Sequence, residues 1–272
     1  MSAQPEWQFV GSVPENYERY LVPSIFGPWA KDLVDIAQLQ PGKRVLDIAC
    51  GTGIVARTAA RILGSGGSTI GLDVSLPMLA VARSAAAAEG LSIDWQEGSA
   101  VKLPLIDAAC DVVLCQQGLQ FFPARPAALR EMHRVLRSGG RLVLSVWAGI
   151  DRSPGFAVLA EALKHRISPE AGALMTSGPF GLSRAEELRT LVANANFRDV
   201  NIGTATKMLQ YPSAPDFVLR YVAGSALGGF FATADESVRS ALLDDVTLAL
   251  SNYVSDHGLA FPIESNILVA QK

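Results

Sequence analysis

Short apolar runs alternate with helical segments along residues 42–147, and this alternation constrains the fold more than any other feature of the sequence. The apolar runs have the length and β-branched content of buried strands: RVLDIA, STIGLDVS, CDVVLCQQ and RLVLSVW. Helical spacing appears between them in GIVARTAARIL, MLAVARSAAAA and residues 126–140. Strands joined by single helices form right-handed βαβ units, so the sequence predicts a parallel sheet covered on both faces.

The alternation ends after Trp147, where longer helical stretches follow. We expect helices over 156–167, 183–197, 214–231 and 235–258, a long strand over 198–212 and a final strand over 265–272. About 45 residues of helix before the last strand are too many for a plain connection, and they predict a cap over one end of the sheet. The expected organisation is an N-terminal helical lid (1–40), a ligand-binding core (41–150), further core elements with cap insertions (151–258) and the final strand (259–272).

Charge and composition limit the kinds of partner. The 272 residues are 49% hydrophobic, enough for a sizeable core, and the net charge of −3 comes without any run of Lys or Arg. Nucleic-acid binders usually carry a basic patch, so we expect no nucleic-acid partner and predict a small-molecule substrate. No stretch approaches the length of a membrane span. The segment SALGGFF leaves a homodimer open, because Leu227, Phe230 and Phe231 suit a contact surface as well as the cap core.

The cysteine and histidine patterns predict no metal site and no disulfide framework. Cys50, Cys110 and Cys115 are odd in number and form no C-x-x-C pair, so we interpret them as buried apolar residues in a reducing, cytoplasmic protein. The first residues, MSAQPEWQFVG, lack the basic and apolar regions of a signal peptide. No H-x-x-x-H pair or Cys/His cluster is present.

A glycine turn after the first strand indicates a nucleotide-like ligand. Gly51, Gly53 and Ala56 spell G-x-G-x-x-A, and Asp73, 20 residues beyond Gly53, is placed to accept the hydroxyls of a ribose. Asp47, four residues before Gly51, would repel a pyrophosphate but attract a cationic head group. This carboxylate disfavours a nicotinamide dinucleotide and favours a ligand with a ribose, an ammonium and no phosphate.

Further motifs occur in order along the chain: VLDIACGTG, GLDVSLPMLAVAR, EGSAVKLPL, CDVVLCQQGLQFFP and ALREMHRVLRSGGRLVLSVW. Together they resemble the class I S-adenosylmethionine-dependent methyltransferases, and most closely the small-molecule enzymes of ubiquinone and menaquinone biosynthesis. The resemblance covers about residues 40–148, under half of the chain. It implies a doubly wound, Rossmann-like, seven-stranded and mostly parallel sheet with an antiparallel last strand, a helical cap from the N-terminus and insertions, and S-adenosylmethionine as the cofactor.

The resemblance also implies cofactor contacts at the matching positions. In order along the chain these are Asp47, Ala49, Gly51 and Gly53 at the methionine end, Asp73 at the ribose, Val74 and Met78 near the adenine, Ser99 and Ala100 beside its ring, and Gln116, Gln117 and Gln120 facing the methionine and the reacting methyl. One departure concerns Ser99, because many relatives carry an aspartate there that accepts a hydrogen bond from the adenine amino group. A serine binds that group less strongly.

The candidates for the reacting end of the site are Gln120, Tyr20 and His165, and Tyr17 is a further candidate for cofactor contact. Tyr17 and Tyr20 are three apart, which puts them on one face of a helix, and a phenol ring attracts a sulfonium by about 0.5–2 kcal/mol. We favour a lid over plain core packing for these rings, and Tyr20 over Tyr17. His165 lies in the cap region, and Gln120 follows the strand expected at CDVVLCQQ. A general base is not required, because alignment alone supplies about 7–11 kcal/mol of the barrier.

The prediction is therefore an enzyme that moves a methyl group from S-adenosylmethionine to O, N or C of a small hydrophobic or aromatic metabolite. An aromatic wall suits such a substrate, and its candidates, which suit a core equally well, are Phe121, Phe122, Trp147 and Phe180. Two alternatives remain. One is a member of the fold that binds the cofactor without methylating. The other is a nicotinamide-dependent oxidoreductase, which Asp47 disfavours.

Overall fold

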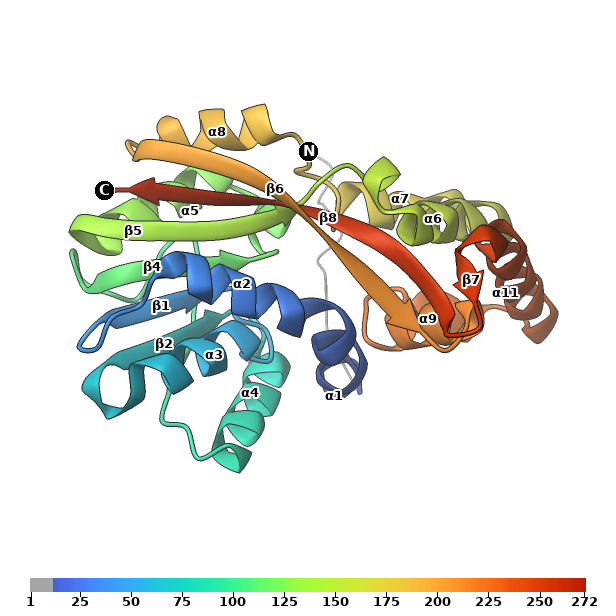
Figure 1. Ribbon diagram of the computed structural model, residues 1–272, viewed down its shortest axis with the longest axis horizontal. Coiled ribbons are helices and arrows are strands. Elements are labelled where there is room, and N and C mark those ends of the chain that lie inside the picture. Colours follow the sequence, from blue (N-terminus) through green and yellow to red (C-terminus); the bar gives the residue numbers. More distant parts are fainter. Residues whose placement is uncertain (1–11) are drawn as a thin grey trace.

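A computed structural model describes residues 12–272 and contains one sheet with the strand order β3-β2-β1-β4-β5-β8-β6, to which β7 adds beside β8 (Figure 1). The strands are β1 Arg44–Ile48, β2 Ser68–Asp73, β3 Asp94–Glu97, β4 Cys110–Gln116, β5 Leu136–Trp147, β6 Arg198–Tyr211, β7 Val254–Ser255 and β8 Gly258–Gln271. Strands β1 to β5 pair in parallel, and β8 is antiparallel to both β5 and β6. The doubly wound, mostly parallel sheet with an antiparallel last strand is confirmed.

Three details of the strands differ from the expectation. The described chain has eight strands instead of seven, because Val254–Ser255 forms a short pairing with the start of β8. Strand β8 begins at Gly258 and not at 265. The helix expected over 126–140 ends at Val135, because the fully buried Leu136 pairs with Cys110 and Gly139 adopts a φ of +73° that no helix contains.

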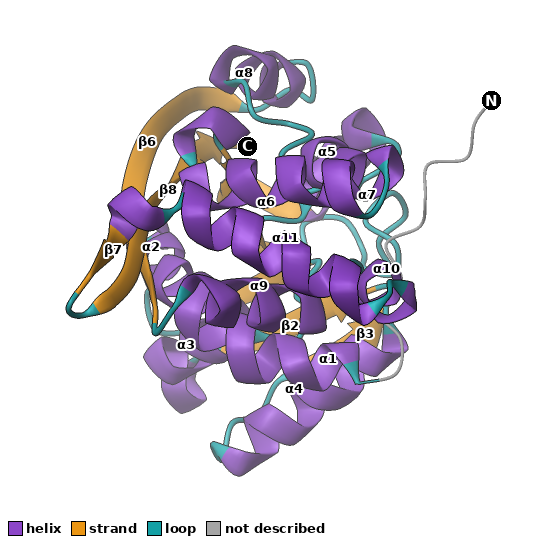
Figure 2. Ribbon diagram, turned by 90° about the vertical axis from the view of Figure 1, so that its right-hand side faces the viewer, coloured by secondary structure: helices purple, strands orange, loops and turns teal. Residues whose placement is uncertain are grey.

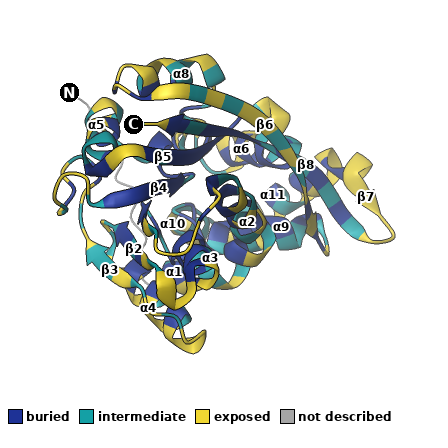
Figure 3. Cartoon of the chain, turned by 60° about the vertical axis from the view of Figure 1, so that its left-hand side comes forward, coloured by how far each residue is buried: buried dark blue, intermediate teal, exposed yellow. Residues whose placement is uncertain are grey.

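Helices cover both faces of the sheet. They are α1 Val13–Asn16, η1 Tyr17–Phe26, α2 Gly27–Ala37, α3 Ile54–Leu63, η2 Gly64–Gly66, α4 Leu76–Ala88, η3 Leu119–Phe121, α5 Arg125–Val135, η4 Ile150–Arg152, α6 Pro154–Arg166, α7 Pro169–Ser177, α8 Ala185–Ala193, α9 Ala214–Ala223, α10 Gly228–Thr233, α11 Glu236–Ala249 and η5 Ser251–Tyr253. Val45 packs in one apolar cluster with α2 and α3, and its neighbour Leu46 packs in another with α5 and α8. Successive residues of a buried strand thus feed two cores, and β4 and β5 are buried along most of their length (Figure 3).

The long strands β6 and β8 run beyond the rest of the sheet and carry the helical cap (Figure 1). Helices α6, α7, α9 and α11 lie at this end, where they form the layer that faces the viewer in Figure 2. An aromatic cluster holds them to the strands: the ring of Phe217 lies 5.4 Å from that of Phe156 and 4.9 Å from that of Phe261. Leu227 is fully buried in this core, and Phe230 packs against it.

The N-terminal segment is helical from Val13 to Ala37, but η1 within it is a π-helix. The wider turn of a π-helix changes which residues share a face, and such turns are frequent at functional sites. Tyr17 stacks on Phe26 with ring centroids 4.9 Å apart, whereas the ring of Tyr20 faces the guanidinium of Arg19 at 5.2 Å. The two tyrosines therefore have different neighbours.

Candidate active site

The turn after β1 combines left-handed backbone with open space. Ala49, Gly51 and Gly53 have φ values of +56°, +55° and +84°. A Cβ on Gly51 would meet no atom within 4 Å, so a ligand has room to approach the backbone there. A Cβ on Gly53 would lie 2.2 Å from the ring of Trp95. Gly53 therefore accommodates Trp95 of β3, a packing residue that no motif in the sequence signals.

Asp47 is 1% exposed at the end of β1, and its Oδ2 accepts a hydrogen bond from the amide of Ala56 at 3.0 Å. The carboxylate thus caps the first turn of α3, where the helix dipole favours negative charge. Burial raises the pKa of Asp47 well above its ordinary value, the charge of Asp73 adds to this, and the bond from Ala56 opposes it. A cation at this point would stabilise the ionised form.

Asp73 ends β2 and holds the glycine turn from the other side. Its Oδ2 accepts from the amide of Gly51 at 2.8 Å, and its Oδ1 accepts from the amide of Ser75 at 2.9 Å. Burial raises the pKa of Asp73, while backbone hydrogen bonds from Ser75, Gly51 and Val74 offset part of that rise. The strand order reverses between β1 and β4, which is where open α/β sheets bind ligands, and β2 lies beside β1.

The residues expected beside the adenine gather near Asp73. The amide of Gly98 donates to the carbonyl of Asp73 at 3.0 Å, which brings Ser99 and Ala100 to the end of β2. Val74 is 68% exposed, an unusual setting for a branched apolar side chain. Ser99 is also exposed, with its Oγ accepting from the amide of Val101 at 3.4 Å, whereas Ala100 and Met78 are buried.

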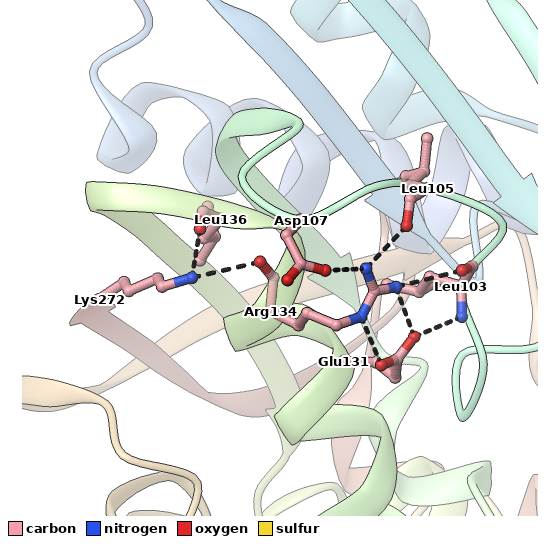
Figure 4. Close-up of polar contacts among 7 residues, drawn as sticks. All are labelled: Leu103, Leu105, Asp107, Glu131, Arg134, Leu136 and Lys272. Carbon is pink, nitrogen blue, oxygen red and sulfur yellow. Dashed lines mark hydrogen bonds and ion pairs between the residues drawn. The ribbon is translucent and has the colours of Figure 1, made fainter.

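The loop that carries Ser99 and Ala100 is fixed from below by α5 (Figure 4). Arg134 donates to the carbonyls of Leu103 and Leu105 at 3.2 and 2.8 Å. Glu131 accepts from the amide of Leu103 at 2.8 Å. Sequence reasoning missed this support, because an i, i+3 pair of opposite charges on a helix is indistinguishable from an ordinary solvated pair.

The turn after β4 packs directly on the glycine turn. A Cβ on Gly118 would lie 2.8 Å from the Cβ of Ala49, so the two turns touch. Gln116 donates from Nε2 to the carbonyl of Phe26 at 3.0 Å, which ties the strand to the N-terminal helices. Gln117 donates to the hydroxyl of Ser265 at 2.9 Å, and Gln120 is 3% exposed. The structure thus brings together the predicted residues after β1, β2 and β4.

Tyr17, at the start of the π-helix, is near enough to the two carboxylates for their charges to affect it. Burial raises the pKa of Tyr17 well above its ordinary value, and the charges of Glu18, Asp73 and Asp47 add to this effect. Glu18 binds the guanidinium of Arg57 on α3 at 2.5 Å, and the same buried guanidinium binds Glu89 at the end of α4 at 2.6 Å. Arg57 therefore joins the N-terminal helix to the two helices that follow β1 and β2.

Two of the candidates for the reacting end lie in different surroundings. The imidazole of His165 is 70% exposed, and its Nε2 lies 3.3 Å from Glu161 on the outer side of α6. This exposed contact is not the setting of a base in a closed site, and it argues against a catalytic role for His165. Tyr20 is half-buried beside Arg19, so Tyr17 is the tyrosine that faces Asp47 and Asp73 electrostatically.

The aromatic residues expected to form a wall divide between edge and core. Trp147 ends β5 and its ring lies 6.2 Å from that of Phe26, beside the strand ends. Phe180 packs 5.8 Å from Phe156 in the cap core. Phe121 and Phe122 are half-buried at η3.

The thiols near this site are buried. All three cysteines are free and buried, and burial raises the pKa of Cys115 to about 12, so its thiol stays protonated. Residues 12–272 contain no group of three acidic, histidine or cysteine side chains arranged to hold a metal. Over the same residues, no helix has the length and apolarity to cross a bilayer.

Comparison with known proteins gives the chain its family. Residues 46–144 match the methyltransferase-domain family. The demethylmenaquinone methyltransferase of Thermus thermophilus is 34% identical over 180 residues, 62% of this chain and 80% of that protein. The 2-phytyl-1,4-naphtoquinone methyltransferase of Synechococcus elongatus is 40% identical over 118 residues, 43% of this chain and 51% of the relative, so the chain spans about half the length of that protein.

A solved structure extends the likeness to the fold of most of the chain. The S-adenosylmethionine-dependent methyltransferase of Aquifex aeolicus superposes with a TM-score of 0.54 at 18% identity, over 75% of this chain and 93% of the other. At this identity the likeness is one of fold. With the match to the Thermus enzyme over most of its length, and the glycine turn between the carboxylates of Asp47 and Asp73, the chain belongs to the class I methyltransferases, whose cofactor is S-adenosylmethionine.

Proposed function

We propose that the protein transfers the methyl group of S-adenosylmethionine to a carbon, nitrogen or oxygen atom of a small aromatic or hydrophobic metabolite. The observation that carries the proposal is the pair of carboxylates, Asp47 and Asp73, on either side of the open turn at Gly51. Their raised pKa values mean that negative charge is held there at a cost, and a positively charged ligand offsets that cost. S-adenosylmethionine supplies an ammonium and a sulfonium.

The cofactor contacts follow from this placement. Asp47 and the side-chain oxygen Oε1 of Gln116 attract the ammonium. The backbone at Ala49 and Gly51 lies along the methionine chain of the cofactor. Asp73 accepts both ribose hydroxyls. The exposed Val74 provides an apolar platform for the adenine, and Met78, Ser99 and Ala100 complete its surroundings. Gln117 and Gln120 lie beyond the methionine, on the side of β5 and β8.

The reaction needs alignment more than it needs acid–base chemistry. The acceptor atom attacks the methyl carbon with its electron pair as the bond from that carbon to sulfur breaks. The sulfur keeps that bond's electrons, S-adenosylhomocysteine leaves, and the acceptor gives its proton to solvent. Residues around the methyl align the two molecules and exclude water, which accounts for about 7–11 kcal/mol of the barrier in well-oriented reactions.

We propose that the helical segment within residues 1–40, described from residue 12, acts as the lid of this site. The ion pair from Glu18 to the buried Arg57 holds the lid on α3, and the bond from Gln116 to the carbonyl of Phe26 holds it on β4. Tyr17 then lies over the cofactor. Opening the lid breaks both links.

The substrate class is proposed from the aromatic edge and from the relatives. Trp147, 5% exposed at the end of β5, packs its ring beside those of Phe26 and Trp29. The names of the relatives given above refer to demethylmenaquinone and to a phytylated naphthoquinone. We infer a substrate with an aromatic ring, received between the strand ends and the cap of residues 151–258. The three buried, free thiols suit the cytoplasm, where we place the protein.

The test is a methyl-transfer assay with S-adenosylmethionine labelled in the methyl group, offered to a panel of naphthols, phenols and naphthohydroquinones. Label that moves into an organic product, with release of S-adenosylhomocysteine, supports the proposal. Binding of S-adenosylhomocysteine without transfer to any acceptor would favour a non-methylating member of the family instead.

A further inference from the structure

A chain of buried hydrogen bonds at the end of β4 has a fixed direction. Its last acceptor is the carbonyl of Val146 on β5, which accepts a hydrogen bond from the hydroxyl of Ser265 on β8 at 3.0 Å. A carbonyl has no proton to give, so the Ser265 hydroxyl has to be the donor. The lone pairs of Ser265 Oγ then remain to accept one.

Gln117 supplies the donor to Ser265 Oγ, and this bond sets the direction of the next one. Its Nε2 donates to Ser265 Oγ at 2.9 Å, so the amide is oriented with its nitrogen toward β8. Gln117 Oε1 therefore faces the other way, where it accepts from Nε2 of Gln120 at 3.4 Å. Gln117 Nε2 also donates to Ser145 Oγ at 3.4 Å, and the shorter contact with Ser265, whose hydroxyl is committed to Val146, favours this orientation of both amides.

The chain ends on an acceptor that has no donor. Gln120 is 3% exposed, and among the described residues its Oε1 has no hydrogen-bond partner. Buried polar atoms are nearly always paired, so this atom requires an explanation. Gln116 shows the same arrangement, since its Nε2 is taken by Phe26 and its Oε1 is left unpaired.

The buried hydrogen bonds connect two parts of the proposed site. Gly118, two residues before Gln120, packs on Ala49 of the glycine turn. Val146, the last acceptor, precedes Trp147, whose ring lies 6.2 Å from that of Phe26. The hydrogen-bonded series from Gln120 through Gln117 to Ser265 therefore runs from the turn beside Ala49 to the end of β5.

We propose that Gln120 Oε1 accepts a hydrogen bond from a hydroxyl group on the aromatic substrate, and that Gln117 and Ser265 are positioning residues that hold the amide in the accepting orientation. This inference rests on the proposed function and deepens it. A substrate that presents a hydroxyl pairs with the buried oxygen, whereas one that presents only an acceptor at the same place brings two oxygen lone pairs together. These buried hydrogen bonds thereby select a substrate that donates a hydrogen bond.

The experiment compares two probes, 1-naphthol and 1-methoxynaphthalene, in which a methyl group replaces the hydroxyl hydrogen, binding to full-length protein saturated with S-adenosylhomocysteine. We expect the wild-type protein to bind 1-naphthol at least about tenfold more tightly, the size of one buried hydrogen bond. In Gln120→Met the preference falls to about one, because the hydroxyl loses its acceptor. The matched control is Gln210→Met, an exposed glutamine on β6, which keeps the preference.

The positioning role has its own variants. In Ser265→Ala the amide nitrogen of Gln117 keeps only its longer contact with Ser145 Oγ at 3.4 Å, and a serine hydroxyl can donate as well as accept. The amide can then turn over and Gln120 presents its nitrogen, so the preference for 1-naphthol falls while the affinity for S-adenosylhomocysteine is kept. Ser265→Thr retains the hydroxyl and restores the preference. If Ser265 had a purely structural role, its loss would lower the affinities for 1-naphthol and for 1-methoxynaphthalene together and leave their ratio unchanged.

Each outcome decides the matter. An unchanged preference in a folded Gln120→Met protein overturns the proposal, as does an unchanged preference in Ser265→Ala. Binding of S-adenosylhomocysteine with neither naphthalene bound overturns the aromatic-hydroxyl assignment and leaves the methyltransferase proposal intact. Failure to bind S-adenosylhomocysteine overturns the proposed function, and this inference with it.

Discussion

The half of the molecule that surrounds Asp47 and Asp73 and the half that carries the cap are built by different means. Around the carboxylates, short side chains accept hydrogen bonds from backbone amides at Ala56, Gly51 and Ser75. In the cap, large rings such as Phe217 and Phe261 pack on one another, far along the strands β6 and β8. In the first half, holding negative charge for a ligand lowers the stability of the empty protein. In the second half, burial of apolar side chains raises stability.

This difference separates binding from stability. A residue of the carboxylate half can be removed with a large loss of affinity and a small loss of stability. A residue of the cap core has the opposite effect. Four substitutions test the distinction, starting with the one from which we expect the largest change.

Phe217→Ala is expected to lower the free energy of unfolding by about 3–5 kcal/mol, because the fully buried ring leaves a cavity among four aromatic neighbours. Denaturant unfolding measures the loss. Leu219→Ala on the same helix, where the side chain is 46% exposed, should change it by less than about 0.5 kcal/mol. Equal effects of the two substitutions would mean that the aromatic cluster does not hold the cap.

Asp73→Ala is expected to weaken the binding of S-adenosylhomocysteine by about 10²–10³-fold, since two hydrogen bonds from the ribose to a charged group are lost. Calorimetric titration measures the affinity. Asp73→Asn, which keeps an acceptor for Gly51, should lose less. Asp94→Ala, at the exposed start of β3, should bind as the wild type does, and a matching loss there would show that the effect on Asp73 is not local.

The sequence predicted the carboxylate half well because its signals are local. Asp47, Gly51 and Asp73 are placed by strand ends and a tight turn, and each is recognisable within a few residues of its strand. The cap, by contrast, depends on which distant segments meet. No local sequence pattern indicates that Phe156, Phe217 and Phe261 share a core, or that strand pairing ends α5 at Val135.

Asp47→Asn is expected to change stability and affinity in opposite directions. A carboxyl whose pKa is raised by folding holds its proton more tightly in the folded state, so stability falls as the pH rises from the ordinary carboxyl pKa to the raised one. Asparagine cannot ionise and still accepts from Ala56, so the empty variant should be more stable than wild type at neutral pH. Its affinity for S-adenosylhomocysteine should fall by about tenfold or more.

The same carboxyl gives the pH dependence of binding. The ammonium of the ligand favours ionised Asp47, so the wild-type affinity should decrease as the pH is lowered from about 8 to about 5, and that of Asp47→Asn should change less. Titrations at several pH values measure both. A variant that is less stable and binds as tightly as wild type would contradict the role of this carboxylate.

Glu18→Gln tests the link between the lid and the core, with the smallest expected effect. It removes the charge that pairs with Arg57 and keeps the shape, and because Glu18 is partly solvated the stability loss should be about 1 kcal/mol. We expect S-adenosylhomocysteine to dissociate about three- to tenfold faster in stopped-flow displacement, with Glu15→Gln in the exposed part of α1 unchanged. Equal dissociation rates of S-adenosylhomocysteine from Glu18→Gln and from wild type would show that the ion pair between Glu18 and Arg57 does not hold the lid closed.

Parts of the site lay beyond sequence reasoning for a physical reason. Trp95, Arg134 and Arg57 act through contacts between elements far apart in the chain, and each sits in an ordinary sequence context. Tyr17 and Tyr20 were expected to share a helical face, and the π-helix gives them different neighbours. His165 was chosen for its chemistry alone, and an exposed pairing with Glu161 accounts for it.

The most direct test of the central claim is a calorimetric titration of the wild-type protein with S-adenosylhomocysteine and, separately, with NADH. The account predicts micromolar or tighter binding of S-adenosylhomocysteine and no binding of NADH, because the buried Asp47 attracts an ammonium and repels a pyrophosphate. Binding of NADH, or no binding of S-adenosylhomocysteine, would contradict the placement of the cofactor between Asp47 and Asp73.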